Sequence, residues 1–125
     1  MSSELMLKVV TPAQVEEVII LLDRLAEARR ARAAQGKRQS AEDIIIDPAR
    51  GALADYLYGL SDAARKELIA LMLLGRGDFE HSYLRALETC SKYVDPDDQV
   101  IYLMGKTVRL AEYLRVGLDS IARMV

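Results

Sequence analysis

Apolar and polar residues follow a helical period through most of the chain. In the first long segment, apolar side chains recur every three or four residues: Val15, Val18, Ile19, Leu22 and Leu25. Charged residues fill the positions between them, as on a helix with one buried face. Thr11 and Gln14 have the spacing of a capping box, and Pro12 suits a first helical turn. The pattern predicts a helix over about residues 11–34.

One segment has no polar face. Residues 68–74 are seven consecutive apolar residues, so we expect a helix that other helices enclose at the centre of the core. Gly75-Arg76-Gly77-Asp78 follows it directly. We expect Gly75 and Gly77 to end this helix where positive φ is needed, and Asp78 to cap the next helix.

The remaining pattern predicts further helices. Asp47-Pro48 and Asp95-Pro96 each place a capping residue before proline, which is typical of a helix start. Gly105 is expected to precede a last helix beginning near Thr107. A further helix is predicted after Asp78 and before Asp95. Its predicted inward face is Phe79, Tyr83, Leu84, Leu87, Cys90 and Val94.

The predicted fold is therefore all-α: a single compact bundle of five or six helices with a buried central helix. We divide it into a helix over about 11–34, a linker over about 35–46 and a helical core over about 47–125. Leu5 to Val10 reads as a short extended segment, and β-branched Ile44 to Ile46 favour pairing with it in a small sheet.

Composition narrows the function classes only slightly. A chain of 125 residues with net charge -2 fits one soluble domain, and it neither indicates nor excludes nucleic acid. The single cysteine excludes an intrachain disulfide. No segment approaches the roughly 20 apolar residues of a membrane span, and the first residues lack the pattern of a secretory signal. We expect a cytoplasmic protein with no membrane association and no cofactor.

Three segments resemble a known family. They are residues 68–78 (Leu-Ile-Ala-Leu-Met-Leu-Leu-Gly-Arg-Gly-Asp), residues 102–105 (Tyr-Leu-Met-Gly) and residues 110–118 (Leu-Ala-Glu-Tyr-Leu-Arg-Val-Gly-Leu). The chain is similar in these to small bacterial proteins grouped as domain of unknown function 3775. The resemblance implies a helical fold and a bacterial origin, and it implies no activity.

The segment after the central helix offers the first candidate site. Arg76 next to the start of a helix is a guanidinium to which an acidic partner or a phosphate can bind, with Asp78 and His81 nearby. The competing interpretation is that Arg76 pairs with a carboxylate such as Asp55 or Glu112. His81 is the only histidine, so we expect no metal site. Cys90 lies on an apolar face and is interpreted as a core residue.

Two other surfaces are candidates for partners. Five cations fall within ten residues that contain no acid: Arg29, Arg30, Arg32, Lys37 and Arg38. They match a nucleic-acid contact, or else a solvated helix end. The apolar face of Val15, Val18, Ile19, Leu22 and Leu25, widened by Ile20 and Leu21, suggests a homodimer contact.

No convergent set of catalytic groups is visible, so we interpret the protein as a non-catalytic protein-interaction or regulatory module with an unidentified protein partner. The alternatives are a nucleic-acid-associated regulator using Arg29 to Arg38, and a small enzyme with a site near Arg76 and His81. The tyrosines are expected to be ordinary packing residues rather than the lining of a pocket.

Overall fold

The computed structural model describes residues 7–36, 47–78 and 82–123. Within these residues there are six α-helices, one short 3-10 helix and no strand. The elements are α1 (Pro12–Ala34), α3 (Pro48–Gly59), α4 (Asp62–Gly75), α5 (Tyr83–Tyr93), η3 (Pro96–Asp98), α6 (Gln99–Met104) and α7 (Leu110–Arg123). The predicted all-α fold is confirmed.

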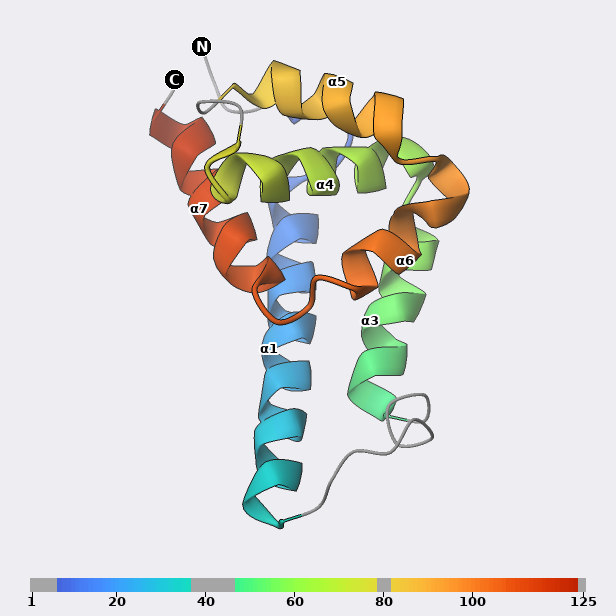
Figure 1. Ribbon diagram of the computed structural model, residues 1–125, viewed down its shortest axis with the longest axis vertical. Coiled ribbons are helices and arrows are strands. Elements are labelled where there is room, and N and C mark those ends of the chain that lie inside the picture. The colour runs from blue at the N-terminus through green and yellow to red at the C-terminus, as the bar shows by residue number, and fades with distance from the viewer. Residues whose placement is uncertain (1–6, 37–46, 79–81, 124–125) are drawn as a thin grey trace.

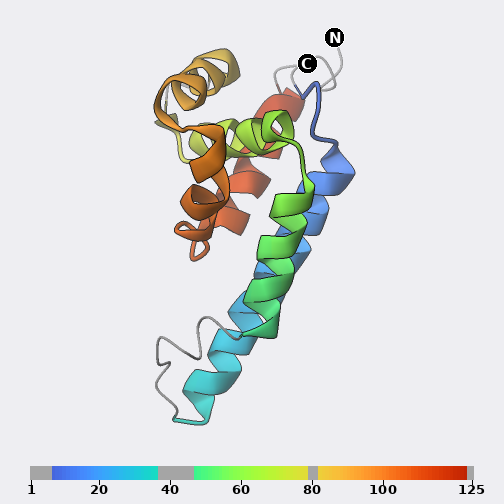
Figure 2. The ribbon, with the colours of Figure 1, turned by 90° about the vertical axis from the view of Figure 1, so that its right-hand side faces the viewer.

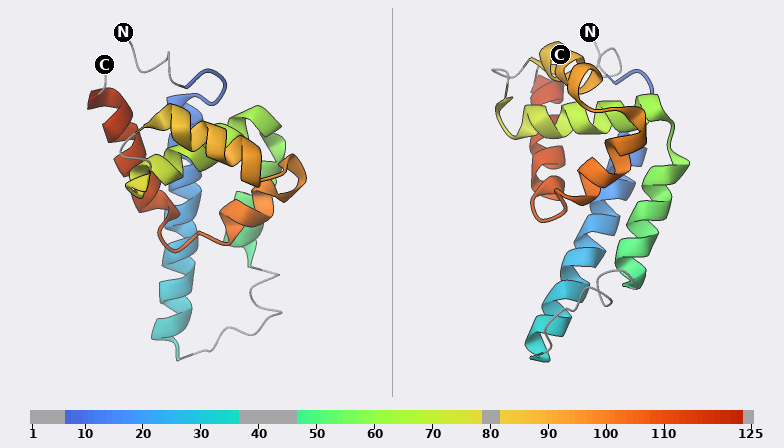
Figure 3. Two further views of the ribbon diagram at one scale, coloured as in Figure 1. Left: turned by 45° about the horizontal axis from the view of Figure 1, so that its top comes forward. Right: turned by 45° about the vertical axis from the view of Figure 1, so that its right-hand side comes forward.

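The helices form a long pair joined to a compact cluster. α1 and α3 pack side by side and run in opposite directions, and they extend away from the other helices (Figures 1 and 2). α4 crosses above this pair and contacts α5, α6 and α7 (Figure 3). The central position predicted for residues 68–74 is confirmed, because every one of these side chains is at most 6% exposed.

Most predicted helix starts are confirmed. The Thr11 hydroxyl accepts from the backbone N–H of Gln14 at 3.0 Å, and the Gln14 side chain accepts from the N–H of Thr11 at 2.9 Å. Asp47 accepts from the N–H of Ala49 at 2.9 Å. The last helix begins at Leu110, three residues later than expected near Thr107, because residues 105–109 form a turn.

The predicted start of the helix after residue 78 is wrong. Ser82, not Asp78, caps this helix, since its hydroxyl accepts from the N–H of Arg85 and α5 begins at Tyr83. Tyr83 and Cys90 of the predicted inward face are buried, but Leu84 is not. Leu84 is 69% exposed although the sequence pattern placed it inward.

The two glycines after the central helix have different roles. Gly77 has a φ of 91°, as predicted, whereas Gly75 is the last residue of α4 and does not have positive φ. A Cβ at residue 75 would lie 1.8 Å from the carbonyl oxygen of Tyr113, and one at Gly117 would lie 2.4 Å from that of Leu71. Gly75 and Gly117 therefore allow the backbones of α4 and α7 to touch.

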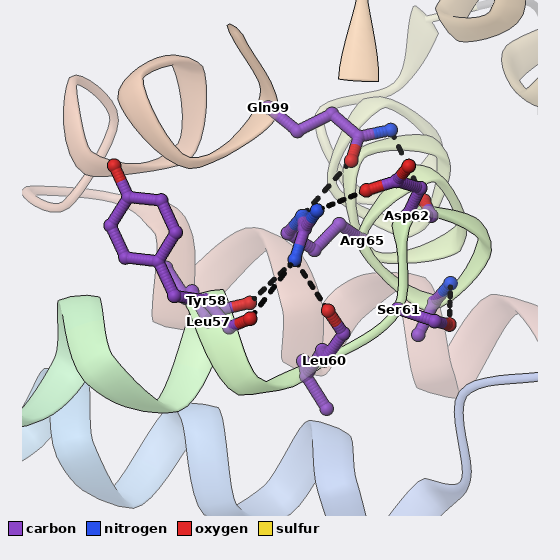
Figure 4. Close-up of polar contacts among 8 residues, drawn as sticks. Leu57, Tyr58, Leu60, Ser61, Asp62, Arg65 and Gln99 are labelled. Carbon is purple, nitrogen blue, oxygen red and sulfur yellow. Dashed lines mark hydrogen bonds and ion pairs between the residues drawn. The ribbon is translucent and has the colours of Figure 1, made fainter. Parts of the chain in front are cut away.

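α4 carries a buried arginine that caps the end of α3 (Figure 4). The guanidinium of Arg65 donates to the carbonyl oxygens of Leu57, at 3.0 Å, and of Leu60, and it pairs with Asp62. Its Nε donates to the Gln99 side chain at 3.0 Å. The Leu57 carbonyl also accepts from the backbone N–H of Leu60, so Arg65 adds a second donor there and joins α3, α4 and α6 at the end of α3, where carbonyls lack partners within the helix.

α4 also carries a buried carboxylate that holds the N-terminal segment. Glu67 is 4% exposed and accepts from the backbone N–H groups of Lys8, Val9 and Val10 at 2.7 to 2.9 Å. The Tyr83 hydroxyl donates to it at 3.3 Å. Burial and the Glu67 carboxylate raise the pKa of Tyr83. The predicted pairing with Ile44 to Ile46 falls on residues outside those described, and Leu7 to Val10 form no strand.

Candidate functional site

Arg76 immediately follows α4 and pairs with Asp78. Its Nη2 and Nε donate to the two oxygens of Asp78 at 2.7 and 3.3 Å. Arg76 therefore pairs with a carboxylate, as the competing interpretation expected, but its partner is Asp78 rather than Asp55 or Glu112. The hydrogen bond to Asp78 raises the pKa of Arg76. Both side chains are about one-third exposed, at 36% and 32%, so the pair lies at the surface rather than within the core.

One side of Arg76 faces a hollow of about 320 Å³ between α4, α5 and α6. We call it the apolar hollow, because most of its surface is apolar and its lining includes Ile69, Leu73, Tyr93, Val94 and Tyr102. Arg76 and Asp78 are among its few charged lining residues, together with Asp98. The arrangement is typical of a recognition pocket, in which a few polar groups orient an apolar ligand.

The described lining of the apolar hollow contains no activated nucleophile. Cys90 lies at its base but is only 1% exposed, and burial raises the pKa of its thiol to about 11. A thiol with such a pKa stays protonated and unreactive near neutral pH. The hydroxyl of Thr89 donates to the carbonyl oxygen of Arg85 at 2.9 Å.

Arg76 also lines a second hollow, of about 270 Å³, which we call the basic hollow. The other lining residues come from the turn between α6 and α7 and from the first turns of α7: Gly105, Lys106, Val108, Arg109 and Tyr113. The Lys106 ammonium lies 5.3 Å from the centroid of the Tyr102 ring, which belongs to the apolar hollow. The two hollows are thus neighbours joined through Arg76 and the Tyr102–Lys106 contact.

Tyr102 and Tyr113 pack against the core, as expected of the tyrosines, but the expectation that no tyrosine lines a pocket is wrong. Tyr93 and Tyr102 line the apolar hollow and Tyr113 lines the basic hollow. Sequence reasoning also missed Lys106 and Arg109. A signal for them exists in the sequence Gly-Lys-Thr-Val-Arg over residues 105–109, where two cations flank a valine in a connection between helices.

None of the other predicted site residues within the described ranges lines either hollow. His81 lies outside the described residues. Residues 7–36, 47–78 and 82–123 contain no group of three side chains suited to hold a metal ion. No helix in these ranges has the length and hydropathy of a bilayer-spanning segment.

Two cations of the basic segment contact other parts of the fold. Arg29 donates to the Thr107 hydroxyl at 3.2 Å, whereas Arg32 lies 3.8 Å from Asp47 at the start of α3. Arg30 is exposed, and Lys37 and Arg38 lie outside the described residues. Two of the five cations are therefore directed to different elements of the fold.

The apolar face predicted for a homodimer is buried within one chain. Its five side chains, Val15, Val18, Ile19, Leu22 and Leu25, are at most 3% exposed. α1 packs there against α3 and α7. Ile20, which is 42% exposed, is the part of this region that solvent reaches. A homodimer stays a prediction, and it cannot use these five side chains unless the core opens.

The chain matches no curated protein and no solved structure. A family model described as "Protein of unknown function (DUF3775)" matches residues 50–122, a span that includes every residue lining the two hollows. This match covers more than half of the 125 residues and confirms the resemblance seen in residues 68–78, 102–105 and 110–118. The chain therefore belongs to the family of proteins of unknown function DUF3775.

Proposed function

We propose that this protein is a non-catalytic interaction module that binds a segment of a partner protein at the apolar hollow. The observation that carries the proposal is the combination of an apolar base with the Arg76–Asp78 pair and the exposed ring of Tyr93 at one surface. Arginine and tyrosine beside an apolar pocket are the residue types that most often dominate binding energy between proteins.

The size of the hollow supports a side chain as ligand. Pockets for drug-sized molecules have volumes of roughly 300 to 1,000 Å³, and the apolar hollow, at about 320 Å³, is at the lower limit. It suits an apolar anchor from a peptide better than a large cofactor. Tyr93 is 72% exposed, so its ring is available to cover such an anchor.

The chemistry of the hollow favours binding over catalysis. The Cys90 thiol is buried and protonated, and the only guanidinium in the lining is already paired with a carboxylate. Catalysis by nucleophile and base needs an ionisable pair within hydrogen-bond reach of a substrate. The described lining residues include the Arg76–Asp78 ion pair but no nucleophile hydrogen-bonded to a general base.

A phage library of random 12-residue peptides, selected on the folded full chain, tests the proposal. We expect enrichment of sequences with an apolar anchor. Tyr93→Ala should weaken an enriched peptide about tenfold, since exposed aromatic rims of this kind are frequent hot spots. Tyr58→Ala is the matched control, because Tyr58 is similarly exposed, at 65%, and lines neither hollow.

Two results would contradict the proposal. One is a selection that enriches no peptide over repeated rounds. The other is an enriched peptide whose affinity falls equally for Tyr93→Ala and Tyr58→Ala. Circular dichroism of both variants establishes that any loss does not come from unfolding.

We also propose that the module acts in the bacterial cytoplasm. The support is the single free cysteine, which is buried in the core rather than used in a disulfide. Cell fractionation of the native host with an antiserum should find the protein with cytoplasmic markers. Recovery in a periplasmic or membrane fraction would contradict this.

A further inference from the structure

The basic hollow has an excess of positive charge that no ion pair in the described residues balances, although the Lys106 ammonium lies 5.3 Å from the centroid of the Tyr102 ring. Arg76 pairs with Asp78, but neither Lys106 nor Arg109 forms an ion pair in the described part of the chain. Both are exposed. The whole chain has a net charge of -2, so this local excess does not reflect a generally basic protein.

An apolar contact lies within the same surface. Val108, between the two cations, is 88% exposed, which is more than any other large apolar residue described. The turn that carries it is connected at both ends, since the N–H of Lys106 donates to Leu103 and the N–H of Leu110 donates to Lys106. Arg29 also reaches this turn through Thr107. The three side chains of residues 106, 108 and 109 are therefore presented from an anchored turn.

We infer that the partner segment is acidic and that its carboxylates bind the basic hollow while its apolar anchor fills the apolar hollow. This inference rests on the proposed function, because it names the chemistry of the segment bound there. Arg76 lines both hollows, so one peptide can reach an apolar base and two unpaired cations without leaving this face. Charge complementarity of this kind steers association and selects partners.

An acidic protein segment fits better than a nucleic acid. A phosphate backbone binds through many cations along an extended surface, whereas the basic hollow offers two unpaired cations next to apolar surface. The net negative charge of the chain also opposes a long polyanion.

The test begins with the peptides that the phage library selects on the wild-type protein. We expect aspartate and glutamate to be enriched beside the apolar anchor. The dissociation constant of a labelled synthetic copy is then measured by fluorescence anisotropy at 150 mM salt. The double variant Lys106→Glu/Arg109→Glu should weaken binding about tenfold or more, because like charges then face the ligand.

Arg24→Glu/Arg30→Glu is the matched control. It changes the net charge equally, and both residues are exposed on α1 and line neither hollow. Its affinity should stay within about twofold of the wild type, since exposed charges at a distance are largely screened. Circular dichroism checks that both double variants fold.

Three outcomes would overturn the inference. The first is that the selected peptides are not enriched in aspartate or glutamate. The second is that both double variants lose the same affinity for the peptide. The third is that the protein binds a 12-nucleotide oligothymidine more tightly than the peptide. If apolar peptides are selected whose binding depends on Tyr93 but not on Lys106 and Arg109, the partner segment is not acidic, and the proposed function still stands. A selection that enriches nothing would refute the proposed function itself.

Discussion

Replacing Gly75 with alanine tests the close backbone contact between α4 and α7. A Cβ at this residue would lie 1.8 Å from the carbonyl oxygen of Tyr113 and 2.9 Å from the amide nitrogen of Gly117. These are backbone atoms and cannot rotate away, so α4 and α7 would have to move apart by about 1.5 Å. Overpacking on this scale costs about 3 kcal/mol.

The higher helix propensity of alanine offsets about 1 kcal/mol of that cost. We therefore expect Gly75→Ala to lower the free energy of unfolding by about 2 kcal/mol and Tm by about 8 °C for a domain of this size. Urea and thermal unfolding followed by circular dichroism measure both quantities.

Gly51→Ala is the control for this substitution. Gly51 lies inside α3, and a Cβ there would meet no atom within 4 Å. The free energy of unfolding of Gly51→Ala should rise by about 0.5 to 1 kcal/mol from helix propensity alone. If Gly75→Ala unfolds at the same urea concentration as the wild type, the backbones of α4 and α7 do not touch at this glycine and the packing argument fails.

Three further substitutions test the buried polar groups by urea unfolding. Glu67→Gln should lower the free energy of unfolding by about 2 kcal/mol, because an amide cannot replace a carboxylate that accepts three backbone N–H groups. The exposed control Glu88→Gln should stay within about 0.5 kcal/mol of the wild type. Equal urea midpoints for the two variants would contradict this role of Glu67. Arg65→Met should lower the free energy of unfolding by about 2 to 3 kcal/mol, because the Leu60 carbonyl and the buried Gln99 side-chain oxygen lose their donor; an unchanged midpoint would show that Arg65 is dispensable. Burial raises the pKa of the Cys90 thiol to about 11, above about 8.5 in an unfolded chain, so the stability due to the neutral thiol is complete below pH 8.5 and is lost as the pH rises to 11. Between about pH 8.5 and 11, the free energy of unfolding should thus fall more steeply in the wild type than in Cys90→Ala. Parallel curves of stability against pH would refute the raised pKa of Cys90.

Local signals predicted the elements that depend on neighbouring residues. Thr11 and Asp47 cap helices as their spacing to Gln14 and Pro48 indicates. Residues 68–74 are buried because a helix without a polar face has no stable position at the surface. These features need no knowledge of the tertiary arrangement.

Features that depend on distant segments were not predictable from periodicity. Glu67 reads as an ordinary charged residue, and its burial follows from backbone N–H groups more than 55 residues away. The need for glycine at residue 75 comes from Tyr113 on another helix. A hydrophobic pattern reports which face of a helix is buried, and it does not report what lies against that face.

The candidate site was predictable in part for the same reason. Arg76 stands out because it follows a helix at a glycine turn, but its partner Asp78 was assigned to capping instead. Lys106 and Arg109 lie about 30 residues further on, and only the turn between α6 and α7 brings them to Arg76. No spacing in the sequence encodes this arrangement.

The most direct test of the central claim is an amide chemical-shift titration of the isotope-labelled full chain with the peptide that the library selects. If the partner segment binds this face, the largest shifts will fall around both hollows, at Leu73, Arg76, Tyr93 and Lys106. Shifts that instead cluster on α1, around Ile20, would contradict the claim and would place the partner surface on the other helices.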